Sequence, residues 1–139
     1  MIRCKHKSRN LWRVKYITAL RQRMIQIKTR PEIIDTFCSA ITEWFNRKET
    51  TTTKYHKNHH PAIATQTSIG WRHIFMGKIS QEWEKLQGRQ QMRSGKYLDG
   101  YVWAANIVEV SIKHYIILWE QRNNDVHVKH NEQQTQSTK

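Results

Sequence analysis

The fold is decided by residues 101–128, which read YVWAANIVEVSIKHYIILWEQRNNDVHV. Apolar side chains recur there every three or four residues, the spacing that places them on one side of an α-helix. This predicted core-facing stripe consists of Tyr101, Ala104, Ala105, Val108, Ile112, Tyr115, Trp119 and Val126. Other apolar residues, such as Trp103 and Ile107, lie off the stripe, so the helix is apolar nearly all round. We therefore expect a long, central C-terminal helix.

Two polar residues, Arg122 and Asn123, fall within the predicted stripe. Burying a cation and an amide is costly unless each finds hydrogen-bonding partners. The sequence therefore predicts that these two residues have either a structural partner or a chemical role.

Two helices are predicted over residues 11–28 and 29–47. Thr29, Pro31 and Glu32 have the order of a helix start, with a capping residue, a proline in the first turn and a glutamate three residues on. Because Thr29-Arg30 leaves room only for a tight turn, we expect an antiparallel hairpin. This hairpin should pack on the last helix with a common core of Phe37, Ile41, Trp44, Tyr115 and Trp119.

The connection over residues 49–67 is polar and is expected to form a long exposed loop. Short helices should follow over 68–76 and from Ser80, separated by Gly77. No strand alternation or internal repeat is visible. The fold class is therefore all-α, an irregular four-helix bundle with a long central C-terminal helix. The expected organisation is a basic arm (1–10), one helical domain (11–128) and a polar tail (129–139).

The net charge of +13 is concentrated near the N-terminus. Residues 31–139 hold fourteen basic and eleven acidic residues, whereas residues 1–30 hold ten basic and no acidic ones. A one-sided cationic segment attracts nucleic acid or an anionic membrane surface; a basic but merely solvated helix is the simpler interpretation. A mitochondrial presequence would fit the missing acids but not the scarcity of serine. The candidate nucleic-acid-binding residues are Arg3, Lys5, Lys7, Arg9, Arg13, Lys15, Arg21, Arg23, Lys28 and Arg30.

Cysteine and histidine usage predicts no disulfide framework, metal site or cofactor. Two cysteines, Cys4 and Cys38, make a reducing compartment the default, so we expect an intracellular protein, nuclear or cytoplasmic and not secreted. The cluster of His56, His59 and His60 has no carboxylate or thiol at matching spacing, which favours a solvated loop over a metal site. No apolar run of membrane length is present, so no membrane partner is expected.

One resemblance extends over residues 60–128. It consists of the segment QTSIGWRHIFMGKISQEW (66–83), then Trp103-Ala104-Ala105, and then Trp119-Glu120-Gln121-Arg122-Asn123 with His127. These residues resemble uncharacterised segments of retroelement-related and reverse-transcriptase-associated proteins of diatom-like algae. The resemblance implies a mobile-element origin and proximity to RNA or DNA, and it carries over no activity.

A second resemblance concerns Arg122, Asn123 and His127, whose spacing is similar to the motif of HEPN-type ribonucleases. Those proteins are helical bundles that usually cleave as dimers without a metal. The resemblance implies that His127 would transfer a proton, Arg122 would stabilise charge on the phosphorane and Asn123 would orient the pair. On an ideal helix Arg122 and His127 point about 140° apart, so a helix end near His127 would be needed.

Three functions follow from these patterns. The first is a small basic module of mobile-element descent that binds RNA or DNA non-specifically through its N-terminal half. The second is a HEPN-like metal-independent endoribonuclease that uses Arg122 and His127, although a protein without enzymatic activity is favoured. The third is a protein-interaction or oligomerisation bundle, for which a homodimer is allowed.

Overall fold

The computed structural model describes residues 2–3, 7–48, 52–88, 90–91 and 97–137, with the side chains of 90–91, 97–98 and 127–137 left out. Its α-helices are α1 (Lys7–Gln26), α2 (Pro31–Phe45), α3 (His60–Ile69), α4 (Gln81–Gln87) and α5 (Gly100–Ser137). Three 3-10 helices, η1 (Thr52–Lys54), η2 (Lys57–His59) and η3 (Trp71–Met76), lie among them. The strands β1 (Gln90–Gln91) and β2 (Tyr97–Leu98) form one small antiparallel pair with Gln90 opposite Leu98. The predicted all-α class is confirmed.

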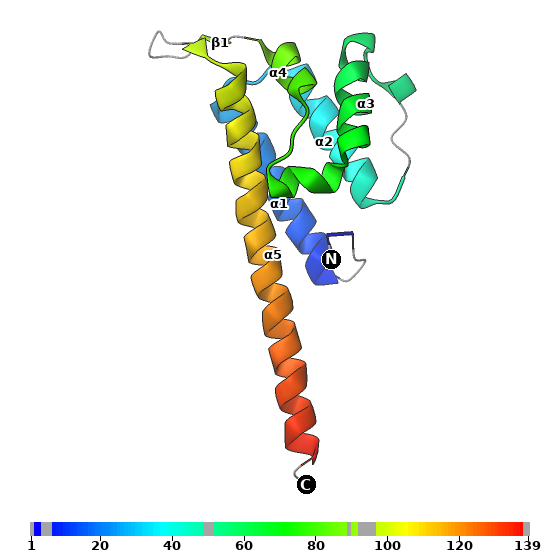
Figure 1. Ribbon diagram of the computed structural model, residues 1–139, viewed down its shortest axis with the longest axis vertical. Helices are drawn as coiled ribbons and strands as arrows, with labels where there is room; N and C mark the ends of the chain where they lie inside the picture. The colour runs from blue at the N-terminus through cyan, green and yellow to red at the C-terminus, as the bar shows by residue number, and fades with distance from the viewer. Residues whose placement is uncertain (1, 4–6, 49–51, 89, 92–96, 138–139) are drawn as a thin grey trace.

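Helix α5 runs along the full length of the molecule (Figure 1). Its first half lies beside α1, with α4 and η3 also against it, and its last turns extend beyond the other helices. The contacts between α1 and α5 run in opposite directions along the two helices. Trp12 Nε1 donates to the carbonyl of His114 (2.7 Å), whereas Arg23 donates to Asn106 (2.9 Å). The two longest helices therefore pack antiparallel.

The predicted hairpin of α1 and α2 is confirmed. Helix α1 ends where Thr29 N donates to Met24 O and Lys28, with φ of 62°, takes the left-handed conformation. Helix α2 then returns along α1, because Tyr16 stacks edge-on against Phe45 while Arg21 pairs with Asp35. The expected cap is wrong: Arg30 precedes α2 without a capping side chain, and Thr29 instead accepts a hydrogen bond from Trp103 Nε1 (2.8 Å).

Aromatic side chains fill the core where the helices meet. Trp12, Tyr16 and Phe75 lie within 5.8 Å of one another, measured between ring centroids. Phe37 packs against both Trp71 and Trp83, so α2 carries the second half of this core. The remaining large, fully buried side chains are Leu20, Met24, Ile33, Ile41, Ile63, Ile74, Trp103 and Ile107.

The orientation predicted for α5 is wrong. Trp119 is 52% exposed and Tyr101 is 74% exposed. The buried residues of this helix are Trp103, Ala104, Ile107, Val110, Ser111 and Leu118, and Ala104 alone among them belongs to the predicted stripe. Because α5 is apolar on both sides, periodicity alone could not identify the side that faces the core. Small side chains, Ala104 and Ser111, lie on the buried side and leave room for neighbouring elements to approach closely.

The expected loop over residues 49–67 is also wrong in its second half. Residues 60–69 form α3, in which Ala62, Ile63 and Gln66 are buried. Tyr55 anchors the preceding segment: its hydroxyl donates to Glu43 (2.7 Å) and lies 3.1 Å from Ser39 Oγ. The segment is polar, so its local composition did not indicate these tertiary contacts.

The expected boundaries at both ends are displaced. Helix α1 begins at Lys7, and Ile2 and Arg9 are buried, so residues 1–10 are not simply an arm outside the domain. Helix α5 continues to Ser137, through most of the predicted polar tail.

Candidate nucleic-acid interface

Several arginines of the predicted basic segment are held by contacts within the protein. Arg9 is buried and pairs with Asp125 (3.4 Å). Arg21 pairs with Asp35 at 2.9 Å, across the hairpin. An arginine that already binds a carboxylate contributes little net charge toward a phosphate. Arg9 and Arg21 therefore stabilise the fold and are not readily available to nucleic acid.

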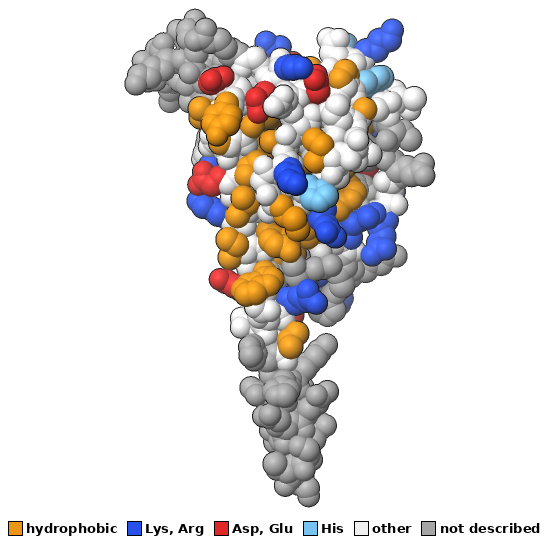
Figure 2. Space-filling model, in the orientation of Figure 1, with side chains coloured by type: hydrophobic (Ala, Val, Ile, Leu, Met, Phe, Trp, Pro, Cys, Tyr) orange, Lys and Arg blue, Asp and Glu red, His pale blue; other side chains and the backbone are white. Residues whose placement is uncertain are grey.

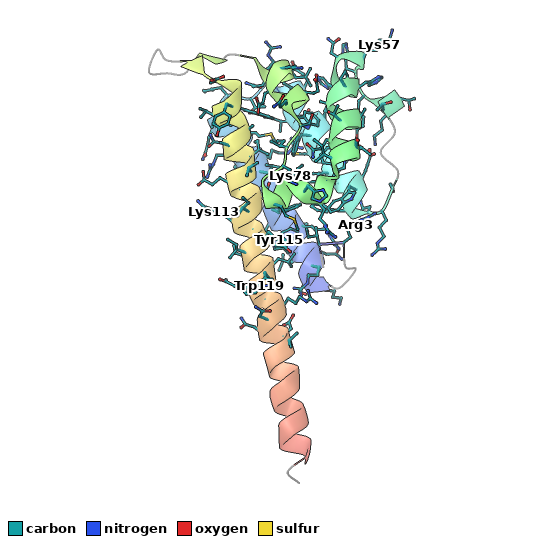
Figure 3. The ribbon with its side chains drawn as sticks, viewed as in Figure 1. Arg3, Lys57, Lys78, Lys113, Tyr115 and Trp119 are labelled. Carbon is teal, nitrogen blue, oxygen red and sulfur yellow. The ribbon has the colours of Figure 1, made fainter. Side chains whose placement is uncertain are left out.

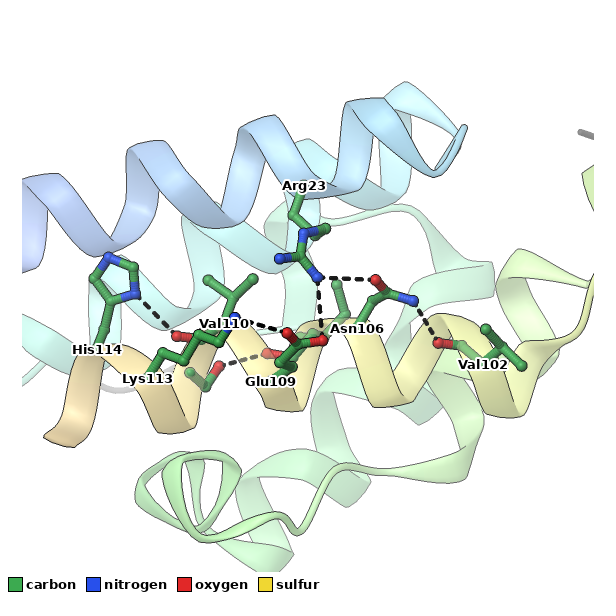
Figure 4. A network of polar contacts seen from close by, with 9 residues as sticks. Arg23, Val102, Asn106, Glu109, Val110, Lys113 and His114 are labelled. Atoms are coloured by element: carbon green, nitrogen blue, oxygen red, sulfur yellow. Dashed lines mark hydrogen bonds and ion pairs between the residues drawn. The ribbon is translucent and has the colours of Figure 1, made fainter. Parts of the chain in front are cut away.

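Arg23 lies at the centre of a polar network on α5 (Figure 4). Its Nη1 donates to Asn106 Oδ1 (2.9 Å) and lies 3.4 Å from Glu109 Oε2. Lys113 also contacts Glu109 at 2.8 Å, and Lys113 with Arg23 lowers the pKa of this carboxyl group. The network joins α1 to α5 and compensates the charge of Arg23.

Two further arginines of the basic segment, Arg13 and Arg3, also have neighbours. Arg13 donates to the carbonyl of Ile2 (2.7 Å) and to the side chain of Asn10. Arg3 lies over the ring of Trp44, with 5.1 Å between the guanidinium carbon and the ring centroid. The first thirty residues therefore present fewer available cations than their composition suggests.

Lys7, Lys15, Lys28 and Arg30 remain exposed, and they make no ion pair with a described residue. Lys5 lies outside the described residues. The available part of the predicted set is thus divided between the first turns of α1 and the turn between α1 and α2.

The turn between α1 and α2 is fixed from behind by α4. Gln87, which is fully buried, accepts from Arg30 N (3.2 Å) and donates to Lys28 O (3.4 Å). An open groove of about 530 Å³ runs beside this turn and is lined by Arg21, Ile25, Lys28, Thr29, Arg30, Pro31, Ile34 and Asp35. The backbone that carries Lys28 and Arg30 is therefore held in place while their side chains stay in solvent.

Sequence reasoning missed further exposed cations outside the first thirty residues. Arg47, Lys57, Arg72 and Lys78 are exposed and form no ion pair within the described chain. In Figure 2 basic side chains gather to the right of the apolar strip, near η3 and the start of the chain. The small net charge of residues 31–139 concealed these cations, because five of the eleven acids that balance it are engaged in ion pairs: Asp35, Glu43, Glu82, Glu109 and Asp125.

The predicted catalytic residues do not assemble into a site within the described chain. Arg122 is exposed and Asn123 is half-buried, and neither forms a hydrogen bond or ion pair with a described residue. The expectation that Arg122 faces the core is wrong, because the side of α5 that meets α1 carries Gln121 and Asp125 instead.

The side chain of His127 lies outside the described residues, but its backbone is helical. Since α5 continues to Ser137, no helix end bends His127 toward Arg122. The catalytic role of Arg122, Asn123 and His127 therefore stays a prediction.

The three histidines around the start of α3 each contact neighbouring residues, and His59 is the buried one among them. His59 is buried, and its Nδ1 is 2.8 Å from Thr36 Oγ1; burial lowers the pKa of His59. His56 accepts from Asn58 N, and His60 Nε2 contacts Tyr55 O. Among the described residues, no three potential ligands form a metal-binding group.

Two tryptophans stand next to an arginine in the sequence and would suit stacking on bases if their rings were exposed. Trp12 and Trp71 are 3% and 2% exposed, respectively, so neither ring is available to a nucleotide. Trp119 is the tryptophan with a largely exposed ring, and its position on α5 was assigned to the core from the sequence.

Comparison of the chain with protein-family models, with curated proteins and with solved structures finds no match. Within the described residues, no helix combines the length and apolar character needed to cross a bilayer.

Proposed function

We propose that the protein binds nucleic acid non-specifically through exposed lysines and arginines. The observation that carries this proposal is the set of exposed cations without an ion pair in the described chain: Lys7, Lys15, Lys28, Arg30, Arg47, Lys48, Lys57, Arg72, Lys78 and Arg122. They outnumber the described acids outside ion pairs, which are Glu32, Glu84, Asp99 and Glu120. A phosphate backbone is the polyanion that such a surface attracts without reading sequence.

Per positive charge, we expect the turn between α1 and α2 to contribute more to the free energy of nucleic-acid binding than the rest of this surface. Gln87 holds the backbone at Lys28 and Arg30, so less conformational entropy is lost when their side chains meet phosphates. The only acid at the adjacent groove, Asp35, is already paired with Arg21. The resemblance to retroelement-associated segments agrees with this proposal but assigns it no residue.

The test is a titration of labelled RNA and DNA, single- and double-stranded, in EDTA at two salt concentrations. If about five cations reach phosphates, log K should fall against log salt with a slope near −4.5 on duplex DNA. The same incubations, examined for product, would register metal-independent RNA cleavage. A chain with no measurable affinity at low salt would contradict the proposal.

Matched double variants separate the turn from the overall charge. Lys28→Gln with Arg30→Gln should weaken binding roughly tenfold and make the slope about 1.8 units shallower. Lys85→Gln with Lys113→Gln removes the same formal charge from lysines that are paired with Glu82 and Glu109, so it should weaken binding less. Equal losses from the two pairs would show that net charge alone matters and that the turn has no special role.

A further inference from the structure

The side of α5 that faces away from α1 carries an apolar surface open to solvent. We call it the α5 stripe; it comprises Tyr101, Ala105, Val108, Ile112, Tyr115, Trp119 and Val126. Tyr101 (74%), Trp119 (52%) and Val126 (58%) are exposed, and Ile116 beside them is 49% exposed. Figure 2 shows these apolar side chains as an orange strip along the helix, and Figure 3 places Tyr115 and Trp119 on it. A contiguous apolar surface of this kind marks an interaction site.

The spacing within the α5 stripe indicates a helical partner. From Tyr101 to Trp119 its positions follow one another at alternating intervals of four and three residues, the pattern that packs one helix against another as knobs into holes. The next position of the repeat is Arg122, and Val126 follows it. From Tyr101 to Val126 the stripe is about 38 Å long, at 1.5 Å per residue. The helix is straight over this length and already rigid, because α1 supports its opposite side (Figure 1).

The two edges of the α5 stripe differ in charge. One edge carries Glu109 and Glu120, and Glu109 is paired there with Lys113 and with Arg23 of α1. The other edge is formed by η3, where Phe75 meets the ring of Tyr115 (6.3 Å between centroids). Beyond η3 stands the exposed Lys78, on the opposite side of α5 from Lys113 (Figure 3).

Helical periodicity adds a second cation to the η3 edge. Arg122 lies about 160° from Glu120 around α5 and thus on the far side of the stripe. It is exposed and has no partner among the described residues. One edge therefore carries the glutamates and the other carries Lys78 and Arg122.

We propose that the α5 stripe binds the α5 stripe of a second copy of this chain, with the two helices parallel. A two-fold axis along the helices brings the glutamate edge of each copy opposite the cationic edge of the other at the same height. Glu109 then faces Lys78, and Glu120 faces Arg122. An antiparallel pair would instead place the two glutamate edges together, so charge selects the parallel arrangement. A helix-only footprint of about 38 by 10 Å on each chain is below the usual size of stable specific interfaces, so we expect a weak dimer that dissociates at roughly 10 µM.

This interface lies on the side of α5 opposite α1, away from the turn at Lys28 and Arg30, and it shares only Lys78 and Arg122 with the proposed nucleic-acid surface. Dimerisation is therefore measured without nucleic acid, and its failure leaves the proposed function untouched. Loss of nucleic-acid binding likewise leaves the dimer untouched.

The first experiment is sedimentation equilibrium over a concentration series from about 1 to 100 µM, a range that spans the expected dissociation constant. The wild-type chain should pass from monomer to dimer, and Trp119→Glu should remain monomeric throughout. Val14→Glu is the matched control, since Val14 is equally exposed (62%) on α1 and lies outside the stripe. It should dimerise like the wild type, and circular dichroism should show that both variants stay helical.

A wild-type chain that remains monomeric over the series would overturn the proposal. So would a Val14→Glu variant that loses dimer as completely as Trp119→Glu. A monomeric chain whose Trp119 fluorescence is quenched by RNA would assign the stripe to nucleic acid instead.

The second experiment fixes the orientation of the two helices by cross-linking. In a Cys4→Ser background, Val126→Cys should form a disulfide-linked dimer on mild oxidation, because parallel helices bring the two Val126 positions together. Cys38 is buried and does not compete. Cross-linking that occurs only when Tyr101→Cys protein is mixed with Val126→Cys protein would show antiparallel helices and overturn the proposed arrangement.

Discussion

The two sides of α5 are both apolar, but one is buried in the core and the other is exposed to solvent. One side holds Trp103, Ile107 and Leu118, all without solvent exposure, whereas the other holds Tyr101 and Trp119, which are more than half exposed. The buried side also has polar bonds to its neighbours: Trp103 donates to Thr29, and Ser111 meets Tyr16 at 2.7 Å. The exposed side has no such bonds from its aromatic residues to described residues. Hydrophobicity alone therefore does not identify the side of a helix that faces the core. That side is the one with matching apolar and hydrogen-bonding partners on neighbouring elements.

The largest expected difference between the two sides is in the tryptophans. Trp103→Ala should lower the free energy of unfolding by about 3–5 kcal/mol, because it empties a fully buried volume and leaves Thr29 without its donor. Trp119→Ala should lower it by less than about 1 kcal/mol, since half of its ring is already in water. Urea denaturation at a concentration where the chain is monomeric measures both. Similar losses from the two variants would contradict this assignment of the sides.

The hairpin and the length of α5 could be predicted because they depend on local signals. A two-residue gap before Pro31 and an apolar run from residue 101 are visible without knowledge of any neighbour. The side of α5 that is buried could not be predicted in this way, since a helical period defines relative angles between residues and not the direction of the core. The small Ser111 opposite Tyr16 was the available signal, because a close helix crossing favours a small residue.

The candidate site was predicted less well than the fold, for a related reason. Counting charges identified a basic segment, but whether an arginine is available depends on distant residues. Arg9 is paired with Asp125 and Arg23 is bound to Asn106, contacts between the two ends of the chain. Lys28 and Arg30 are exposed as expected, and their support by Gln87 could be seen only in three dimensions.

A second comparison between the two sides uses added volume. Ser111→Leu should destabilise the fold by about 1–3 kcal/mol, because Ser111 is fully buried where α1 crosses α5 and has no room for a branched side chain. Ala105→Leu enlarges the exposed side instead, so it should leave monomer stability nearly unchanged and strengthen the proposed dimer. Thermal unfolding and sedimentation equilibrium of both variants check these outcomes. Dimerisation weakened by Ala105→Leu would show that the stripe does not pack against another helix.

A smaller effect is expected from removing one hydroxyl group on each side. Ser111 Oγ donates to Ile107 O, so the hydroxyl of Tyr16 donates to Ser111 Oγ. Burial raises the pKa of Tyr16, which keeps this donor protonated at every working pH. Tyr16→Phe should therefore cost about 1 kcal/mol. Tyr115→Phe, on the half-buried edge of the stripe, should cost close to nothing in the same urea titration; equal costs would argue against a special role for the buried hydrogen bond.

The smallest expected effect is on the pH dependence of stability and concerns Glu109, which lies between the buried and the exposed side of α5. Lys113 and Arg23 lower its pKa below the ordinary value of 4.5. A carboxyl group whose pKa is lower in the folded state stabilises the fold above the unfolded pKa, and this contribution is lost as the pH falls through the folded value. The wild type should therefore lose slightly more stability than Glu109→Gln between pH 7 and about pH 3.5. Glu120→Gln is the matched control, since Glu120 is an exposed acid at the same edge and has no ion pair in the described chain. It should follow the wild type in a comparison of urea midpoints at the two pH values. If Glu109→Gln also follows the wild type, the Arg23 network does not link α1 to α5 electrostatically, and the apolar contacts of the buried side alone hold the two helices together.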